Sequence, residues 1–316
     1  MITLSNIGDV LLAAPVLDIL LRDFPSAQLS LVIGERAASL FEGNARISRI
    51  HIFDKQRSAI EQARWTLDLR QYQYDAVIDL RNSMIGYFLT PRWLTPPLLV
   101  ADKKSHLKDL HLNRLRSLYD FQTGADKPLS ILPSSKDSQR VDQCIQSFLG
   151  KDSSFVLIAP YAADLSKTWD LEKFVQLSQS ISRQYGLKIV MIGSTEHRVG
   201  IEEIVRQSRV SILNLAGQTN LIQLMALVQR SKIAIVHDSG PMHMASYLNK
   251  PIVALFGPTQ PKLSGPWSSL NRVVWQNDQC PRCLNLGLVN VSHNCMSAIS
   301  EQDVLKAFGE VYAKIS

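Results

Sequence analysis

The stretch His237–Ser246 has the sequence HDSGPMHMAS and lies between two apolar runs, KIAIV (232–236) and PIVALFG (251–257). Apolar runs without polar alternation predict strands that are buried on both faces, as in a parallel sheet covered by helices. Ser239 is a good helix N-cap, and Pro241 suits the first turn of a helix. The stretch therefore predicts a strand, a tight turn and a helix that leads to a parallel strand.

The same order of strand, turn and amphipathic helix repeats along the chain. The predicted strands are 29–33, 49–53, 75–80, 155–160, 188–193, 211–216, 233–238 and 251–257. A polar segment with two prolines, 122–137, separates the halves. We therefore predict an α/β protein with two Rossmann-like domains, 1–136 and 137–316, whose parallel sheets face a cleft. The pattern leaves open whether the last helix, 300–314, packs on its own domain or on the first.

The composition of the 316 residues, 46% hydrophobic and 20% charged, is typical of a globular protein. No run of about 18 apolar residues predicts a membrane-spanning helix, and no secretory signal is recognised, so we expect a cytoplasmic protein. The net charge of +6 suits an acidic partner, such as a phosphorylated small molecule or an anionic lipid surface. The sequence contains no motif typical of nucleic-acid binding, and no nucleic-acid partner is expected.

Ligands of open parallel sheets bind beyond the carboxyl ends of the strands. A helix N-terminus there offers free N–H groups and partial positive charge, which suit a pyrophosphate. The candidate residues are Asp238, Ser239, Gly240 and His243 around the turn, Gly257 and Thr259 after the next strand, and Thr219 and Lys167 from two further loops. Thr219 is also predicted to cap a helix. A structural role for His243 and a solvated position for Lys167 remain alternatives.

A second candidate turn, SNIGDVLLAAPV (5–16), follows the short apolar start of the chain. Gly8 allows the backbone to turn sharply, and Asp9 comes next, at the predicted mouth of the sheet. Because proline disrupts a helix interior, Pro15 predicts a regular helix that begins near residue 14 or kinks there. Residues 6–13 would then form an irregular segment open to a ligand. Helix capping is an equally good interpretation of Asp9.

Basic residues supply candidates for binding an acidic molecule. Arg81, in DLRNS (79–83), follows a predicted strand on the cleft side. Lys103 and Lys104 begin a basic stretch, 101–116, that also contains histidines and arginines. A solvated helix face explains that stretch equally well, so Arg81 is the better single candidate.

The late cysteines allow three interpretations. Cys280 and Cys283, with His293 and Cys295, could bind zinc, but the last two lie close together for a structural site. A redox-labile disulfide is a second possibility, and reduced structural thiols are the interpretation we favour. We therefore expect no metal and no cofactor.

Taken together, these motifs resemble the ADP-heptose:lipopolysaccharide heptosyltransferase family, inverting glycosyltransferases of family 9 with the GT-B fold. The similar segments are LSNIGDVLLAAPVL (4–17), a Lys167-x-Trp169 pair, GQTNL (217–221), DSGPMHMASYLNKPIVALFGPTQP (238–261) and the cysteine-bearing segment 280–296. They extend in register through nearly the whole chain.

The resemblance implies roles at the matched positions. Asp9 would be the general base on the acceptor hydroxyl, and Lys167 would neutralise the donor diphosphate. The residues around that diphosphate would be Ser239, Gly240, His243 and Thr259, with Asp238 and Thr219 in the same pocket. The implied partners are an ADP-heptose-like donor and an anionic lipopolysaccharide-type acceptor, met by peripheral contact with the inner membrane face. A GT-B sugar-nucleotide epimerase and a non-catalytic nucleotide-sugar-binding protein are the alternatives.

Overall fold

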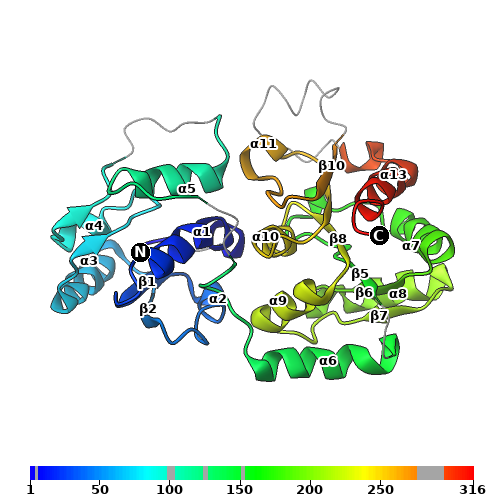
Figure 1. Cartoon of the computed structure of the whole chain (residues 1–316), viewed down its shortest axis with the longest axis horizontal. Coiled ribbons are helices and arrows are strands. Elements are labelled where there is room, and N and C mark those ends of the chain that lie inside the picture. The colour runs from blue at the N-terminus through cyan, green and yellow to red at the C-terminus, as the bar shows by residue number, and fades with distance from the viewer. Residues whose placement is uncertain (4–5, 98–103, 124–126, 151–153, 276–294) are drawn as a thin grey trace. The chain divides into compact units, whose positions relative to one another are not determined.

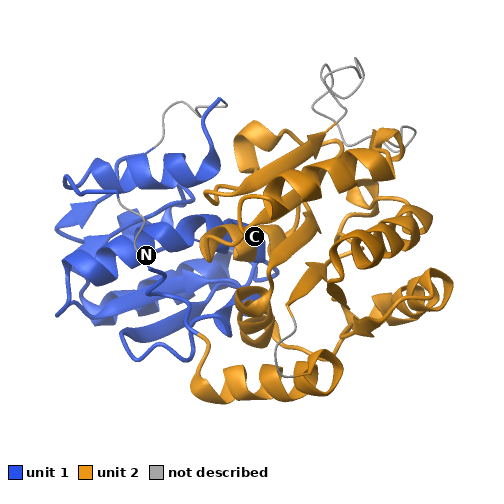
Figure 2. Ribbon diagram, turned by 45° about the vertical axis from the view of Figure 1, so that its right-hand side comes forward, with its two compact units in different colours: residues 1–132 blue, residues 133–316 orange. Residues whose placement is uncertain are grey.

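The computed structural model of the chain describes residues 1–3, 6–97, 104–123, 127–150, 154–275 and 295–316 (Figure 1). The chain divides into two compact units, Met1–Leu132 and Pro133–Ser316 (Figure 2). The boundary between the units lies a few residues before the expected one at 136/137. Ser134 already caps helix α6 (Ser135–Leu149), which belongs to the second unit.

The first unit alternates short strands and helices. Its elements are α1 (Ile7–Asp23), β1 (Leu29–Ile33), α2 (Glu35–Ala38), β2 (Ile47–Ile52), α3 (Ala59–Asp68), the 3-10 helix η1 (Leu69–Tyr72), β3 (Ala76–Val77), α4 (Ile85–Phe88), β4 (Trp93–Leu94) and α5 (Leu107–Arg116). The two-residue strand β4 was not predicted from the sequence, because it is too short to show a pattern.

The strands of the first unit are parallel and form two pairs, which the first residues of the chain connect. β1 pairs with β2, and β3 pairs with β4. Ile2 bridges Val32 on one side and Asp79 on the other. Its N–H donates to the Ile78 carbonyl at 2.8 Å, and its carbonyl accepts from the Leu80 N–H at 3.0 Å. The order is therefore β2–β1–Ile2–β3–β4, and the residues that follow these strands share one edge.

Helix α1 is continuous from Ile7 to Asp23 and contains Pro15, so the expected irregular segment over 6–13 is wrong. An internal proline costs a helix ~3 kcal/mol or more. Apolar burial offsets that cost, since most residues of α1 are buried, and each large aliphatic side chain contributes about 1.5–3 kcal/mol. Asp9 consequently lies inside the first helical turn.

The second unit contains one six-stranded sheet and most of the helices. After α6 come β5 (Phe155–Ile158), η2 (Leu165–Lys167), α7 (Leu171–Tyr185), β6 (Lys188–Met191), η3 (Thr195–His197), α8 (Arg198–Ser208), β7 (Ile212–Asn214), α9 (Leu221–Arg230), β8 (Ile233–His237), α10 (Gly240–Tyr247), β9 (Ile252–Phe256), α11 (Pro261–Ser264), β10 (Asn271–Trp275), η5 (Cys295–Ala298) and α13 (Glu301–Tyr312). The strand order is β10–β9–β8–β5–β6–β7, with every neighbouring pair parallel. The edge strand β10 was not predicted from the sequence.

Helices cover both faces of this sheet. Successive side chains of a strand point to opposite faces. Val156 and Ile158 of β5 belong to a buried cluster that includes Phe174 of α7 and Phe308 of α13. Leu157, which lies between them, is also fully buried, and α10 packs on β8 and on α9 (Figure 1). The last helix, α13, packs on α7, β9 and β10 of its own unit.

Among the described residues, no helix is both long and apolar enough to cross a bilayer.

The end of the first unit is anchored by buried hydrogen bonds. The Asp18 carboxylate accepts the N–H groups of Leu129 and Ser130 at 3.1 and 2.7 Å. The Asn44 amide donates to the carbonyls of the same two residues at 2.8 and 3.1 Å. The segment that leads to the second unit is therefore fixed onto α1.

We expect Asp18→Ala to lower the free energy of unfolding of the first unit by about 1–3 kcal/mol, because two amide groups lose their acceptor. Urea unfolding followed by circular dichroism measures this loss. The control is Glu203→Ala, which removes an exposed ion pair with Arg206 and should change stability by less than about 0.5 kcal/mol. Equal losses in the two variants would contradict the anchoring role.

Candidate functional site

Helix α10 begins directly beyond the carboxyl end of β8, as the sequence predicted. Ser239 is the N-cap residue, but its hydroxyl donates to the His237 carbonyl at 3.2 Å and does not cap an N–H. Its carbonyl accepts the N–H groups of Met242 and His243. Because Pro241 has no N–H, the N–H of Gly240 is what the first turn can offer a ligand at this edge of the sheet.

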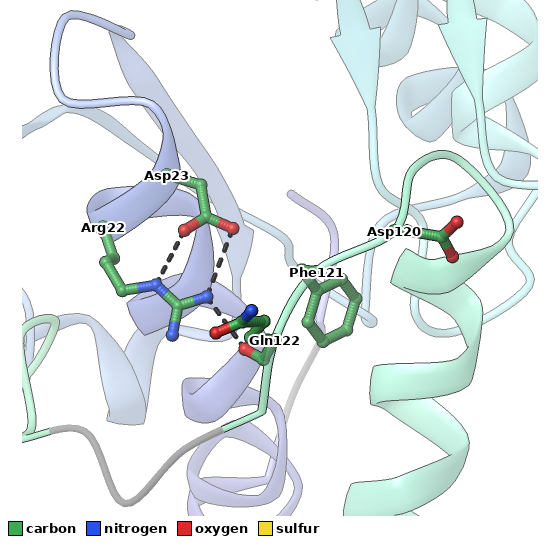
Figure 3. Close-up of a pocket in the computed structure, with 5 residues that line it drawn as sticks. All are labelled: Arg22, Asp23, Asp120, Phe121 and Gln122. Carbon is green, nitrogen blue, oxygen red and sulfur yellow. Dashed lines mark hydrogen bonds and ion pairs between the residues drawn. The ribbon is translucent and has the colours of Figure 1, made fainter.

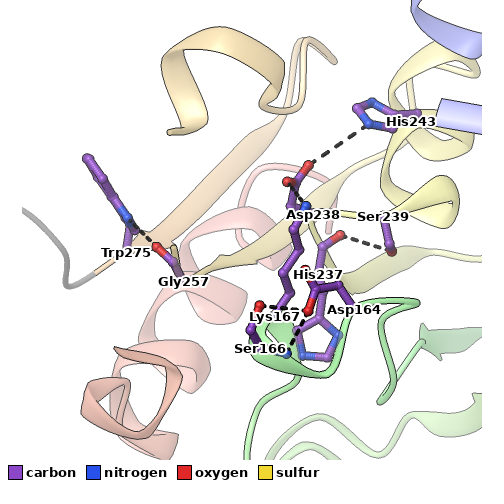
Figure 4. A network of polar contacts seen from close by, with 9 residues as sticks. All are labelled: Asp164, Ser166, Lys167, His237, Asp238, Ser239, His243, Gly257 and Trp275. Atoms are coloured by element: carbon purple, nitrogen blue, oxygen red, sulfur yellow. Dashed lines mark hydrogen bonds and ion pairs between the residues drawn. The ribbon is translucent and has the colours of Figure 1, made fainter. Parts of the chain in front are cut away.

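Lys167 and Asp238, both predicted as site residues, form an ion pair in the second unit (Figure 4). Lys167 Nζ donates to Asp238 Oδ2 at 2.8 Å, and the Asp238 side chain is only 7% exposed. A lysine ammonium has three N–H donors, so two remain for oxygen atoms of a ligand. Asp238 thus orients Lys167 close to the start of α10, and the alternative of a solvated Lys167 is wrong.

The loop that carries Lys167 is held by a buried histidine. The Trp169 N–H donates to His237 Nε2 at 3.1 Å, and Trp169 Nε1 donates to the Ile299 carbonyl at 3.0 Å. Burial lowers the pKa of His237 to about 4. The imidazole is therefore neutral at physiological pH, with Nε2 as acceptor and the proton on Nδ1.

His243 is buried on the first turns of α10. Its Nε2 lies 4.0 Å from Asp238 Oδ1, and its ring stacks on Trp267 at a centroid distance of 5.8 Å. His243 is therefore held between a carboxylate and an indole, beside the Lys167–Asp238 pair.

The residues after β9 have two different roles. A Cβ at Gly257 would lie 2.5 Å from Met296 Sδ, so this glycine allows η5 to pack closely. Its carbonyl also accepts from Trp275 Nε1 at 3.1 Å (Figure 4). Thr259 Oγ1, in contrast, is buried without a hydrogen-bond partner among the described residues. A buried hydroxyl without a partner is unfavourable, so a ligand atom would satisfy it.

Thr219 does not cap the helix that follows it. Asn220 is the N-cap of α9, and its side chain accepts the Gln223 N–H at 2.8 Å within a capping box. Both asparagine and threonine favour N-caps, so the sequence alone did not distinguish two adjacent positions.

In the first unit, the structure brings together Asp9 and Arg81, which are far apart in sequence. Arg81 Nη1 lies 3.2 Å from Asp9 Oδ2, and the two side chains are 38% and 26% exposed. The Asn6 side chain also donates to Asp9 Oδ2, at 3.5 Å. Asp9 is not the N-cap of α1, so the capping interpretation is wrong. A partly exposed carboxylate beside a guanidinium can exchange protons with a ligand.

Arg81 is positioned by Asp79, a buried residue that sequence reasoning missed. Asp79 Oδ1 accepts the Arg81 N–H at 2.9 Å, and Oδ2 accepts the Ser83 hydroxyl at 2.8 Å. The Asp79 N–H donates to Thr95 Oγ1 at 2.9 Å. Asp79 therefore fixes the turn after β3 from which Arg81 reaches Asp9.

Helix α5 adds two buried basic residues to the same unit. Burial, then the positive charges of Arg81 and Arg114, lower the pKa of His111 to about 4. Arg114 is 5% exposed and donates to the Pro96 carbonyl at 3.2 Å. Its Nε and Nη1 have no hydrogen-bond partner among the described residues. A buried guanidinium with spare N–H donors favours an anionic ligand, since buried donors without an acceptor are costly.

The solvated-face interpretation of 101–116 is therefore only partly correct. Lys104 is exposed before α5, and Lys108 pairs with Asp109 at 3.3 Å. Lys103 lies outside the described residues. The side chains of His111 and Arg114, three residues apart on one helix face, are the buried members.

Cys280, Cys283 and His293 also lie outside the described residues, and Cys295 is buried at the start of η5. In the part of the chain that the structure describes, no three His, Cys, Asp or Glu side chains gather as metal ligands.

A shallow pocket of about 600 Å³ lies elsewhere in the first unit, at the end of α1 (Figure 3). Arg22 Nε donates to Asp23 at 2.7 Å, and Arg22 Nη2 donates to the Gln122 carbonyl at 2.9 Å. Arg22 and Asp23 already satisfy each other, so this pocket is a weaker candidate than the strand ends.

The comparisons with known proteins identify the family and the fold. Residues 63–290 match the family model glycosyltransferase family 9 (heptosyltransferase). Over 289 residues, and 83% of each chain, the sequence is 25% identical to lipopolysaccharide heptosyltransferase 3 of Escherichia coli K12.

Two solved structures extend over almost the whole chain. A family 9 glycosyl transferase from Veillonella parvula has a TM-score of 0.83 at 22% identity, covering 99% of this chain and 96% of that one. The E. coli ADP-heptose lps heptosyltransferase II has a TM-score of 0.73 at 18% identity, covering 99% and 98%. With parallel sheets in both units, the chain has the GT-B fold, and it is a glycosyltransferase that belongs to family 9, the heptosyltransferase family.

Proposed function

We propose that this glycosyltransferase moves a heptose, or a closely related sugar, from an ADP-linked donor to a lipopolysaccharide core-type glycolipid, with inversion. The observation that carries the proposal is the Lys167–Asp238 ion pair beside the N-terminus of α10. The relative from E. coli whose name includes ADP-heptose supports the donor. Because the acceptor is a glycolipid, we place the protein in the cytoplasm, in peripheral contact with the inner membrane face.

The second unit would bind the donor diphosphate. Lys167 has two spare N–H donors, Gly240 at the start of α10 supplies a backbone N–H, and Thr259 offers a hydroxyl without a partner among the described residues. The positive potential of these groups acts on the oxygen that leaves with the nucleotide. It stabilises the negative charge that develops on that oxygen. Asp238 would keep Lys167 in position during this change, and Ser239, Gly240, His243 and Thr219 complete the proposed donor site.

The first unit would bind and activate the acceptor. Asp9 would accept the proton of the attacking hydroxyl, which lets that oxygen displace the diphosphate in a single step and invert the sugar carbon. Arg81 and Arg114 would hold an acidic group of the acceptor, with Lys103 and Lys104 as further candidates. When a ligand anion engages Arg81, the Asp9 carboxylate is freed from its ion pair.

The direct test mixes the protein with ADP-, UDP- or GDP-linked heptose and a phosphorylated core glycolipid, followed by mass spectrometry. We expect the acceptor mass to rise by one heptose only with the ADP donor, and an anomeric configuration opposite to that of the donor. A changed sugar nucleotide without acceptor would instead identify an epimerase. Donor binding without any product would identify a non-catalytic binder.

We expect Asp9→Asn to lower kcat by about 10²–10⁴, because a general base contributes that factor. The dissociation constant for the donor should stay nearly unchanged, since the substituted residue lies in the other unit. The matched control is Asp23→Asn at the opposite end of α1, which also loses an aspartate–arginine pair but should retain turnover. Equal loss of donor affinity in Asp9→Asn would contradict the role of a base.

A second prediction concerns His237 as a positioning residue for Lys167. In His237→Leu the Trp169 N–H loses its acceptor, so the Lys167 loop should loosen and KM for the donor should rise at least about tenfold, the equivalent of ~1.4 kcal/mol. In His237→Gln the amide oxygen can take the place of Nε2 and should restore most of that affinity.

Steady-state kinetics on both variants, with melting temperatures as a check of folding, measure this effect. If His237→Gln were as impaired as His237→Leu, or if kcat fell without a change in KM for the donor, the hydrogen bond would not be what positions Lys167.

A further inference from the structure

The segment that connects α11 to β10 is fixed along helix α10. The Trp267 N–H donates to Ser246 Oγ at 3.4 Å, and the Ser269 N–H donates to Asn249 Oδ1 at 2.8 Å. Ser246 belongs to the last turn of α10, and Asn249 follows that helix directly. The backbone at Trp267 is therefore held beside the second half of α10.

A glycine allows this segment to leave α11 sharply. The Gly265 N–H donates to the Pro261 carbonyl at 2.7 Å, and a Cβ at Gly265 would collide with that carbonyl. A residue with a side chain could not take this position unless α11 moved. The tight turn precedes Trp267 by two residues and directs the chain from α11 toward α10.

The indole of Trp267 reaches back along α10 toward the start of that helix. Its ring stacks on His243, with the centroids 5.8 Å apart and an angle of 27° between the planes. His243 precedes Ser246 by three residues, so Trp267 contacts two residues on the same side of α10. The indole is half-buried, whereas His243 is only 5% exposed. Trp267 therefore covers one face of the imidazole.

A single carboxylate faces both His243 and Lys167 (Figure 4). Asp238 Oδ2 accepts from Lys167 Nζ at 2.8 Å, whereas Asp238 Oδ1 lies 4.0 Å from His243 Nε2. The second distance is longer than that of a hydrogen bond. An imidazole that turned toward this carboxylate would share it with Lys167. The stack on Trp267 opposes that movement, because it fixes the plane of the imidazole.

We propose that Trp267 is a positioning residue for the donor diphosphate and acts through His243. The indole fixes the imidazole, and the imidazole lies beside the Lys167–Asp238 pair that would meet the phosphate oxygens. Trp267 itself need not touch the donor. This inference rests on the proposed function in one respect, that the second unit binds the diphosphate of a nucleotide sugar.

The test is a double-mutant cycle on the full chain, with ADP and inorganic pyrophosphate as the probes in equilibrium dialysis. We expect Trp267→Ser to raise Kd for both probes about threefold to tenfold, the range that an aromatic stack contributes. KM for the acceptor should stay unchanged. Trp267→Phe keeps a flat ring and should bind both probes like the wild type. In a chain that already carries His243→Ala, Trp267→Ser should change Kd by less than about twofold, because its effect passes through His243.

Tryptophan fluorescence gives a second readout, which does not require the serine variant to fold. ADP should change the emission of the wild type, and most of that change should be lost in Trp267→Phe. The matched control is Trp65→Phe, which also removes one tryptophan but lies in the first unit, packed against Phe53. This control should keep the change in emission.

Three results of the binding experiment would overturn the inference: unchanged Kd values in Trp267→Ser, a Trp267→Phe variant as impaired as Trp267→Ser, or additive effects in the cycle. A change in emission that persists in Trp267→Phe would also overturn it. Binding of both probes without any transfer of sugar would overturn only the proposed function. A wild type that binds neither ADP nor pyrophosphate would overturn both.

Discussion

The parallel pairing of β5, β8 and β9 is the constraint on which the proposed donor site depends. Because the three strands run in the same direction, the segments after them share one edge of the sheet. That edge receives Lys167 from the loop after β5, Asp238 from the end of β8 and Thr259 from the turn after β9. The ion pair between the first two is a consequence of strand order, since the residues are far apart in sequence.

The two candidate sites differ in how strongly their charges are held. Asp238 is almost completely buried, and a neutral histidine beneath it fixes the loop of its lysine partner. The Asp9–Arg81 pair is partly exposed, and such pairs contribute only about 0–1 kcal/mol to stability. The weak pair is easily opened, which suits the base that we propose, because that base must meet a new acceptor in each cycle. The buried pair instead keeps one geometry, which suits the proposed role of binding the same diphosphate in each cycle.

Much of this arrangement could be predicted from the sequence, because it depends on local patterns. The apolar runs indicated the larger strands, and the strand ends then indicated Asp9, Arg81, Lys167 and Asp238. The helix across Pro15 could not be predicted, because the burial that offsets the proline is a property of the whole unit. The same holds for Arg114: a basic helix face has the same sequence pattern whether it lies in water or against a loop.

His237 shows most clearly why a site residue can escape a reading of the sequence. It ends a strand of apolar residues and is fully buried, so its pattern is that of a core position. A histidine in the core must be neutral, and a neutral imidazole has one nitrogen that can accept a hydrogen bond. In this fold, that nitrogen accepts the N–H of Trp169, a buried backbone group that would be costly to leave without an acceptor. His237 therefore helps to fix the position of Lys167 from within the core of the sheet. Its own side chain carries no charge and need not contact the proposed donor.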